Sequence, residues 1–117
     1  MSEMKQIIIL RKDLGMRKGK CVAQGAHASM KATLKNMADP RVIQWLQGPF
    51  AKICVSVDSE DELLTIVEKA REKGLIAEVI VDSGRTEFNG KPTLTAAGIG
   101  PDTAENLDPI TGKLKLL

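Results

Sequence analysis

The stretch that decides the fold is KICVSVDSEDELLTIVEKAREKGLIAEVIV, residues 52–81. It begins with a β-branched run at residues 52–57, continues with a segment of helical periodicity and ends with a second apolar run at residues 76–81. Between the two runs, Ser59 and Glu62 have the spacing of a capping box, which predicts that a helix begins there. A strand, a helix and a strand with short connections indicate two parallel strands joined by a right-handed crossover.

Further predicted elements flank this unit on both sides. Residues 6–10 predict a buried strand, residues 20–36 a helix, and residues 40–46 a second, shorter helix. After the central unit, the sequence predicts a strand at residues 92–99, a tight turn at residues 98–101 and a last helix at residues 102–107. The length of 117 residues predicts a single domain over residues 1–117, and helices that alternate with strands predict an α/β fold. We expect a three-layer α/β/α sandwich around a four-stranded mixed, mostly parallel sheet.

Composition excludes several classes of protein. The chain has 117 residues, a net charge of +2 and only 3% aromatic residues, so a sheet that stacks nucleic-acid bases on aromatic rings is disfavoured. One histidine, His27, and two cysteines, Cys21 and Cys54, are too few for a four-ligand zinc site. Two unpatterned cysteines indicate a reducing compartment, and no segment has the ~20 apolar residues of a membrane span. We therefore expect a cytoplasmic protein without a metal.

Polar segments follow two of the predicted strands. Residues 11–19 follow the first strand, and DSGRT at residues 82–86 follows the third. Because ligands bind beyond the carboxyl ends of parallel strands, we expect both segments at one edge of the sheet. Asp82, with the Thr86 hydroxyl, can hold a lysine or orient a water. Alternatively, Asp82 only accepts a hydrogen bond from its own turn, which Gly84 permits.

One face of the first predicted helix carries a row of polar side chains. Lys20, Gln24, His27 and Lys31 fall within about 60° of one another at 100° per residue. The row begins at the helix N-terminus, where unpaired N–H groups and the positive dipole end favour an anion. This face is either a solvated surface or part of a binding site.

The small net charge conceals an uneven distribution. Residues 1–35 carry eight basic and two acidic side chains, whereas residues 36–117 carry nine basic and thirteen acidic ones. The dense cluster at residues 11–20 predicts contacts with the phosphates of a nucleic acid, although a solubilising loop is the alternative. Two glycine patterns carry no such meaning. Residues 98–100 lack the third glycine of a dinucleotide fingerprint, and residues 15–20 lack the spacing of a P-loop.

These segments together resemble the type 2 peptidyl-tRNA hydrolase family. The resemblance covers nearly the whole chain and rests on six motifs in the same order and spacing. The motifs are KDLxMxKGK at residues 12–20, AQxxHA at 23–28, VDSExEL at 57–63, DxGRT at 82–86, GIGP at 98–101 and ITGxLxLL at 110–117.

The resemblance implies an enzyme that hydrolyses the ester between a peptide and the 3′ ribose of tRNA, without a cofactor and as a homodimer. It assigns catalysis to Lys20, Asp82 and Thr86, and associates Gln24 and His27 with the same site. We expect the basic side chains of Arg17, Lys18 and Arg85 to contact the tRNA. The family usually has Ala and Gln where this chain has Ser83 and Glu87, which alters the local polarity.

The residue types favour direct attack by water. We expect Lys20 to stabilise the developing oxyanion, and Asp82 to position Lys20 or, with Thr86, to polarise the water. A neighbouring carboxylate favours the charged ammonium, which disfavours Lys20 as a general base. Two other classes remain open: a tRNA- or RNA-binding adaptor without catalysis, and a protein–protein interaction domain. A carboxylate beside the lysine favours the enzyme, because a phosphate-binding protein gains nothing from it.

Overall fold

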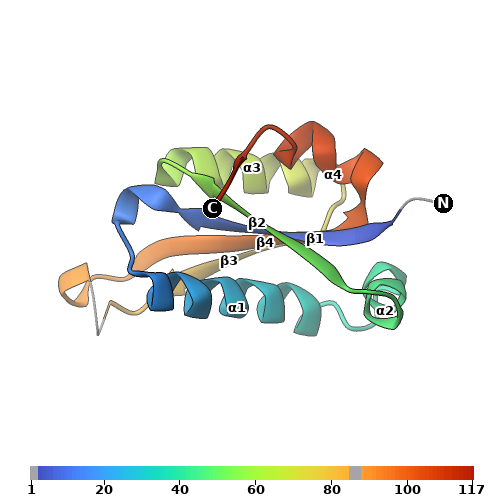
Figure 1. Cartoon of the computed structure of the whole chain (residues 1–117), viewed down its shortest axis with the longest axis horizontal. Helices are drawn as coiled ribbons and strands as arrows, with labels where there is room; N and C mark the ends of the chain where they lie inside the picture. Colours follow the sequence, from blue (N-terminus) through green and yellow to red (C-terminus); the bar gives the residue numbers. More distant parts are fainter. Residues whose placement is uncertain (1–2, 85–87) are drawn as a thin grey trace.

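The computed structural model describes residues 3–84 and 88–117, which form five strands, four α-helices and two short 3₁₀ helices. Helices α1 and α2 lie on one face of the sheet and α3 and α4 on the other, so the predicted three-layer sandwich is confirmed (Figure 1). The elements in chain order are β1 (Met4–Arg11), η1 (Lys12–Leu14), α1 (Lys18–Leu34), α2 (Pro40–Gln47), β2 (Ala51–Val57), α3 (Glu60–Glu72), β3 (Ala77–Asp82), η2 (Phe88–Gly90), β4 (Thr93–Thr103), α4 (Ala104–Thr111) and β5 (Lys115–Leu116).

The sheet has the strand order β3-β4-β1-β2-β5, and β1 with β2 is the one parallel pair among these described strands. The predicted four-stranded, mostly parallel sheet is therefore wrong in both strand number and direction. Among the described residues between β3 and β4 there is no α-helix, and β4 pairs antiparallel with β3. Strand β5 has two residues, too few for an alternating pattern in the sequence.

The central strand–helix–strand unit has the predicted direction. Strands β2 and β3 run the same way, but β1 and β4 lie between them in the sheet. The Ser59 hydroxyl accepts a hydrogen bond from the Glu62 amide at 3.0 Å, so the predicted start of α3 is confirmed. Because β1 and β3 are also parallel in direction, their carboxyl ends open at one edge, beside the start of α1 (Figure 1).

Strand β4 is longer than its predicted range and contains the segment that we expected to turn. GIGP at residues 98–101 continues the strand to Thr103, so the predicted tight turn is wrong. Gly98 instead lets α1 approach the sheet, because a Cβ there would lie 2.6 Å from the Ala28 carbonyl oxygen. This glycine serves the packing of a helix on a sheet.

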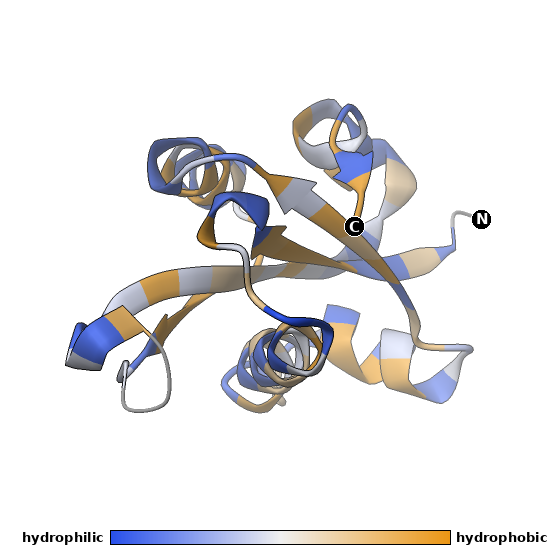
Figure 2. Ribbon diagram, turned by 60° about the vertical axis from the view of Figure 1, so that its left-hand side comes forward, coloured by the Kyte–Doolittle hydropathy of each residue, from blue (hydrophilic) through white to orange (hydrophobic). Residues whose placement is uncertain are grey.

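The two sides of the sheet pack differently, and the strands between them show long stretches of hydrophobic colouring (Figure 2). On the side of α3 and α4, large side chains such as Leu63 and Ile99 form the main core. On the other side, α1 turns small residues such as Ala28 and Ala32 toward the sheet. The apolar residues that give α1 its helical spacing are exposed, among them Met30 at 57% and Leu34 at 59%.

Candidate active site at the carboxyl edge of the sheet

A lysine and an aspartate meet at this edge. Lys20 lies in the first turn of α1 and Asp82 is the last residue of β3. The Lys20 Nζ donates to Asp82 Oδ1 at 2.8 Å, and the two side chains are only 16% and 12% exposed. The structure thus brings together two of the three residues expected to be catalytic. The third, Thr86, lies outside the described residues.

Asp82 both holds a lysine and accepts a hydrogen bond from its own turn, because its two oxygens have different partners. While Oδ1 accepts from Lys20, Oδ2 accepts from the Gly84 amide at 2.9 Å. These two hydrogen bonds, Lys20 first, lower the pKa of Asp82 below its ordinary value, so the carboxylate is ionised at neutral pH. Gly84 has φ +82°, and a Cβ there would lie 2.4 Å from the Lys91 carbonyl oxygen, so this turn requires glycine.

Gln24 connects the pair to the interior of the protein. Its Nε2 lies 3.5 Å from Asp82 Oδ1, and its Oε1 accepts from the Thr95 hydroxyl at 2.5 Å. Thr95 is fully buried in β4, at a point where the register with β3 shifts: Ile80 pairs with Ala96, but Val81 pairs with Leu94. Thr95 was not among the residues predicted for the site. A hydroxyl in an otherwise apolar run was the available signal.

The other two members of the polar row on α1 have separate surroundings. His27 is exposed, and its charge is a smaller contribution to the lowered pKa of Asp82. Lys31 donates from Nζ to the Val79 carbonyl oxygen at 2.7 Å and so ties α1 to β3. His27 therefore belongs to the neighbourhood of Asp82, whereas Lys31 holds the helix in place.

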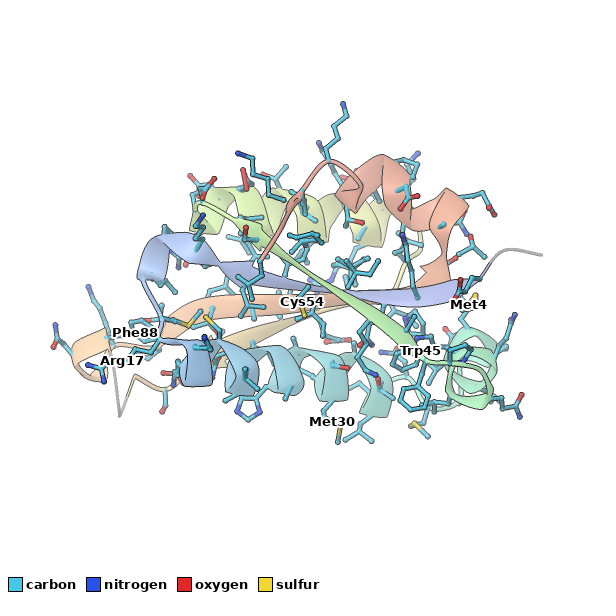
Figure 3. All side chains as sticks on the ribbon, viewed as in Figure 1. Met4, Arg17, Met30, Trp45, Cys54 and Phe88 are labelled. Atoms are coloured by element: carbon cyan, nitrogen blue, oxygen red, sulfur yellow. The ribbon has the colours of Figure 1, made fainter. Side chains whose placement is uncertain are left out.

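The cations of the N-terminal cluster are dispersed in space. Arg17 and Lys18 are exposed at the start of α1, and Figure 3 shows Arg17 at the same end of the molecule as Phe88. Lys18 lines an apolar groove of about 260 Å³ with Cys21 and Val22, on the flank of α1 away from Lys20.

Other members of the cluster are already paired with acidic groups. Arg11 Nη2 contacts Asp13 Oδ2 at 2.6 Å, and its Nη1 lies 3.8 Å from Glu60 Oε1. The charge of Arg11 is therefore compensated by two neighbouring carboxylates. Arg85 and Glu87 lie outside the described residues, and the side chain of Ser83 is exposed.

Within residues 3–84 and 88–117, no group of three or more His, Cys, Asp and Glu side chains is arranged to hold a metal ion. In the same part of the chain, no helix combines the length and the apolar character needed to cross a membrane. The chemistry available at the edge is that of an ammonium, a carboxylate, an amide and an imidazole.

This fold and this site define an α/β protein with a fixed ammonium–carboxylate pair, suited to stabilising an anion, at the open edge of its sheet. The chain belongs to the family described as peptidyl-tRNA hydrolase PTH2, which it matches over residues 4–117. It is 47% identical to the peptidyl-tRNA hydrolase of Methanocaldococcus jannaschii over 116 residues, 97% of this chain and all of the relative.

Two further relatives have the same name and match the same share of this chain. The peptidyl-tRNA hydrolase of Methanothermobacter thermautotrophicus is 44% identical over 114 residues, 97% of this chain and all of that protein. The one of Thermoplasma volcanium is 44% identical over 115 residues, 97% of each chain. The family resemblance seen in the motifs is thereby confirmed.

Proposed function

We propose that this chain hydrolyses the ester that joins a peptide to the 3′ ribose of tRNA and releases both products, as the names of its relatives indicate for those proteins. The observation that carries the proposal is the pair of Lys20 and Asp82, held 2.8 Å apart where β3 ends and α1 begins. Because ribosomes make peptidyl-tRNA in the cytoplasm, we place the activity there.

In the proposed reaction, a water oxygen adds to the ester carbonyl carbon and gives up a proton, and the tetrahedral intermediate collapses as the ribose 3′ oxygen takes up a proton and leaves as a hydroxyl. The Lys20 ammonium stabilises the negative charge that develops on the carbonyl oxygen. Asp82 acts mainly by positioning Lys20, since both of its oxygens already accept hydrogen bonds from Lys20 and Gly84. We retain Thr86 as the candidate that orients the water.

Gln24 and His27 are the proposed substrate contacts nearest this pair. The Gln24 amide is fixed by Thr95 and reaches Asp82, while His27 is exposed on the same side of α1. We propose that Arg17, Lys18 and Arg85 contact tRNA phosphates. The two described members of this group, Arg17 and Lys18, are exposed and lie at a helix N-terminus, where anions are favoured.

We also propose a homodimer that buries the outer surfaces of α1 and α2. Exposed apolar side chains of this extent are uncommon on monomers, and a twofold axis would bury two such faces together. Among the described residues, seven of the eleven exposed large apolar side chains lie on α1, on α2 or in the segments that adjoin α2, all in one layer of the molecule (Figure 1): Val22, Met30, Leu34, Met37, Ile43, Leu46 and Phe50.

Light scattering with size-exclusion chromatography tests the dimer. We expect twice the monomer mass for the native chain and the monomer mass for the Leu34→Glu variant. Leu64→Glu is the matched control, because Leu64 is similarly exposed but lies on α3, in the other layer. A native chain that elutes as a monomer would overturn this part of the proposal.

The activity itself is tested by mixing the protein with N-acetyl-aminoacyl-tRNA and following the release of the N-acetyl amino acid. We expect many turnovers per protein molecule in the presence of EDTA. Tight binding of the tRNA without release would instead make the chain a tRNA-binding adaptor. Neither binding nor release would favour a protein–protein interaction domain.

A further inference from the structure

Arg11 makes contacts that a tRNA-binding cation does not need. It ends β1, and its side chain is only 11% exposed. Its Nε and Nη2 donate to the two carboxylate oxygens of Asp13, at 3.2 and 2.6 Å, and its Nη1 donates to the Leu94 carbonyl oxygen at 2.9 Å. A guanidinium with three donors engaged in this way has little left to offer a phosphate.

The two partners of Arg11, Asp13 and Leu94, lie in different segments, one next to α1 and the other in β4. Asp13 belongs to η1, and the chain runs from η1 through Met16 directly into α1 and Lys20. Leu94 adjoins Thr95 at the register shift in β4, and Thr95 holds Gln24, which reaches Asp82. Irregularities of this kind redirect a side chain from the sheet toward a site.

We propose that Arg11 is a positioning residue, which fixes the start of α1 and the irregular segment of β4 relative to each other and thereby sets the alignment of Lys20 and Asp82. The inference rests on the proposed function, because it concerns how that site is assembled. Arginine is required because its planar fork binds a carboxylate through two donors and a carbonyl through a third. Lysine at this position keeps the charge but loses the fixed geometry.

The test compares Arg11→Lys with a matched variant, Arg71→Lys. Arg71 also clamps a backbone carbonyl, since its Nε and Nη2 donate to the Ala77 oxygen at 3.2 and 2.9 Å, but Ala77 begins β3, at the end of the strand opposite Asp82. We expect both variants to fold with similar losses of Tm. Only Arg11→Lys should lower kcat, by about 10- to 100-fold, with KM for tRNA within about twofold of the native value.

A double-mutant cycle identifies the route of the effect. If Arg11 acts through Thr95 and Gln24, the pair Arg11→Lys and Thr95→Val should lose little more activity than the worse single variant. If Arg11→Lys does not fold, Asp13→Asn provides a second way to weaken the contact between Arg11 and η1. This variant should also lower kcat rather than raise KM.

Three outcomes would overturn this inference: kcat unchanged in a folded Arg11→Lys, equal losses of kcat in Arg11→Lys and Arg71→Lys, or a raised KM with a reduced salt dependence. The last result would make Arg11 a phosphate contact. The native chain is assayed first. If it releases no N-acetyl amino acid, that result counts against the proposed function and not against the positioning role of Arg11.

Discussion

The Lys20 ammonium and the Asp82 carboxylate lie 2.8 Å apart, although 62 residues separate them in the chain. They meet because β1 and β3 run in the same direction, and α1, which follows β1, packs back across the end of β3. The carboxylate compensates the ammonium in a place with little solvent, and the Gly84 amide and Gln24 fix the carboxylate in turn. The site is therefore a connected set of hydrogen bonds between distant segments.

Replacing Asp82 by asparagine should remove the charge that holds Lys20 while keeping the size of the side chain. We expect Asp82→Asn to lower kcat on N-acetyl-aminoacyl-tRNA by at least about tenfold, because a charge-assisted hydrogen bond becomes a neutral one. Asp58→Asn is the matched control: Asp58 is exposed just beyond β2, at the same edge of the sheet. Equal activity of the two variants would contradict the role of Asp82.

The lowered pKa of Asp82 predicts how its contribution to stability depends on pH. A carboxyl group whose pKa is lower in the folded state stabilises the protein fully above its unfolded pKa of about 3.9, and this stabilisation is lost as the pH falls through the folded pKa. Urea unfolding of the native chain and of Asp82→Asn measures the effect. The difference in free energy of unfolding should stay constant from pH 5 to 7 and shrink below about pH 4. A difference that grows on acidification would show the opposite shift.

Gly84→Ala should disturb the carboxylate without unfolding the core. Its Cβ would lie 2.4 Å from the Lys91 carbonyl oxygen, so the turn that donates to Asp82 must move. Gly90→Ala is the control, because Gly90 also has a positive φ, +74°, but has open space around a Cβ. We expect the loss of kcat to be several times larger for Gly84→Ala than for Gly90→Ala, although the positive φ costs each variant about 1–3 kcal/mol of backbone strain. Similar losses of kcat would show that the close approach to Lys91 is unimportant.

The exposed cations at the start of α1 should govern binding more than chemistry. Arg17→Ala combined with Lys18→Ala should raise KM for tRNA and leave kcat nearly unchanged. Each phosphate contact that is lost should reduce the slope of log K against log salt by about 0.7–0.9. Lys35→Ala, just beyond the other end of α1, is the control and should change neither quantity. An unchanged salt slope in the double variant would place the tRNA elsewhere on the surface.

The elements that local patterns define were predictable, and the pairings between them were less so. The capping box of Ser59 and Glu62 and the alternation of strands and helices correctly predicted the layers. The direction of β4 depends on the short connection after β3, whose described residues form no α-helix, and the sequence does not distinguish such a connection from a crossover. Similarly, Gly98 signals a turn in the sequence, but its actual constraint is the Ala28 backbone packed against it.

The residues of the site also fall into a predicted and an unpredicted group. Lys20, Gln24 and Asp82 were predicted because their spacing and position at strand ends are local features of the sequence. Thr95 and the clamp made by Arg11 were not, because a register shift and a contact between residues 83 positions apart leave no periodic signal. The approach of Glu60 to Arg11 was not predicted either, since these residues meet only in the folded chain.

The role of Lys20 is tested by the turnover number of Lys20→Ala on N-acetyl-aminoacyl-tRNA, measured with saturating substrate beside the native chain. Loss of one group that stabilises an oxyanion lowers kcat by about 10²–10³-fold, and we expect a loss of this size with KM changed by no more than a few-fold. Near-normal turnover by a folded Lys20→Ala protein would contradict the assignment of Lys20 and, with it, this account of the site.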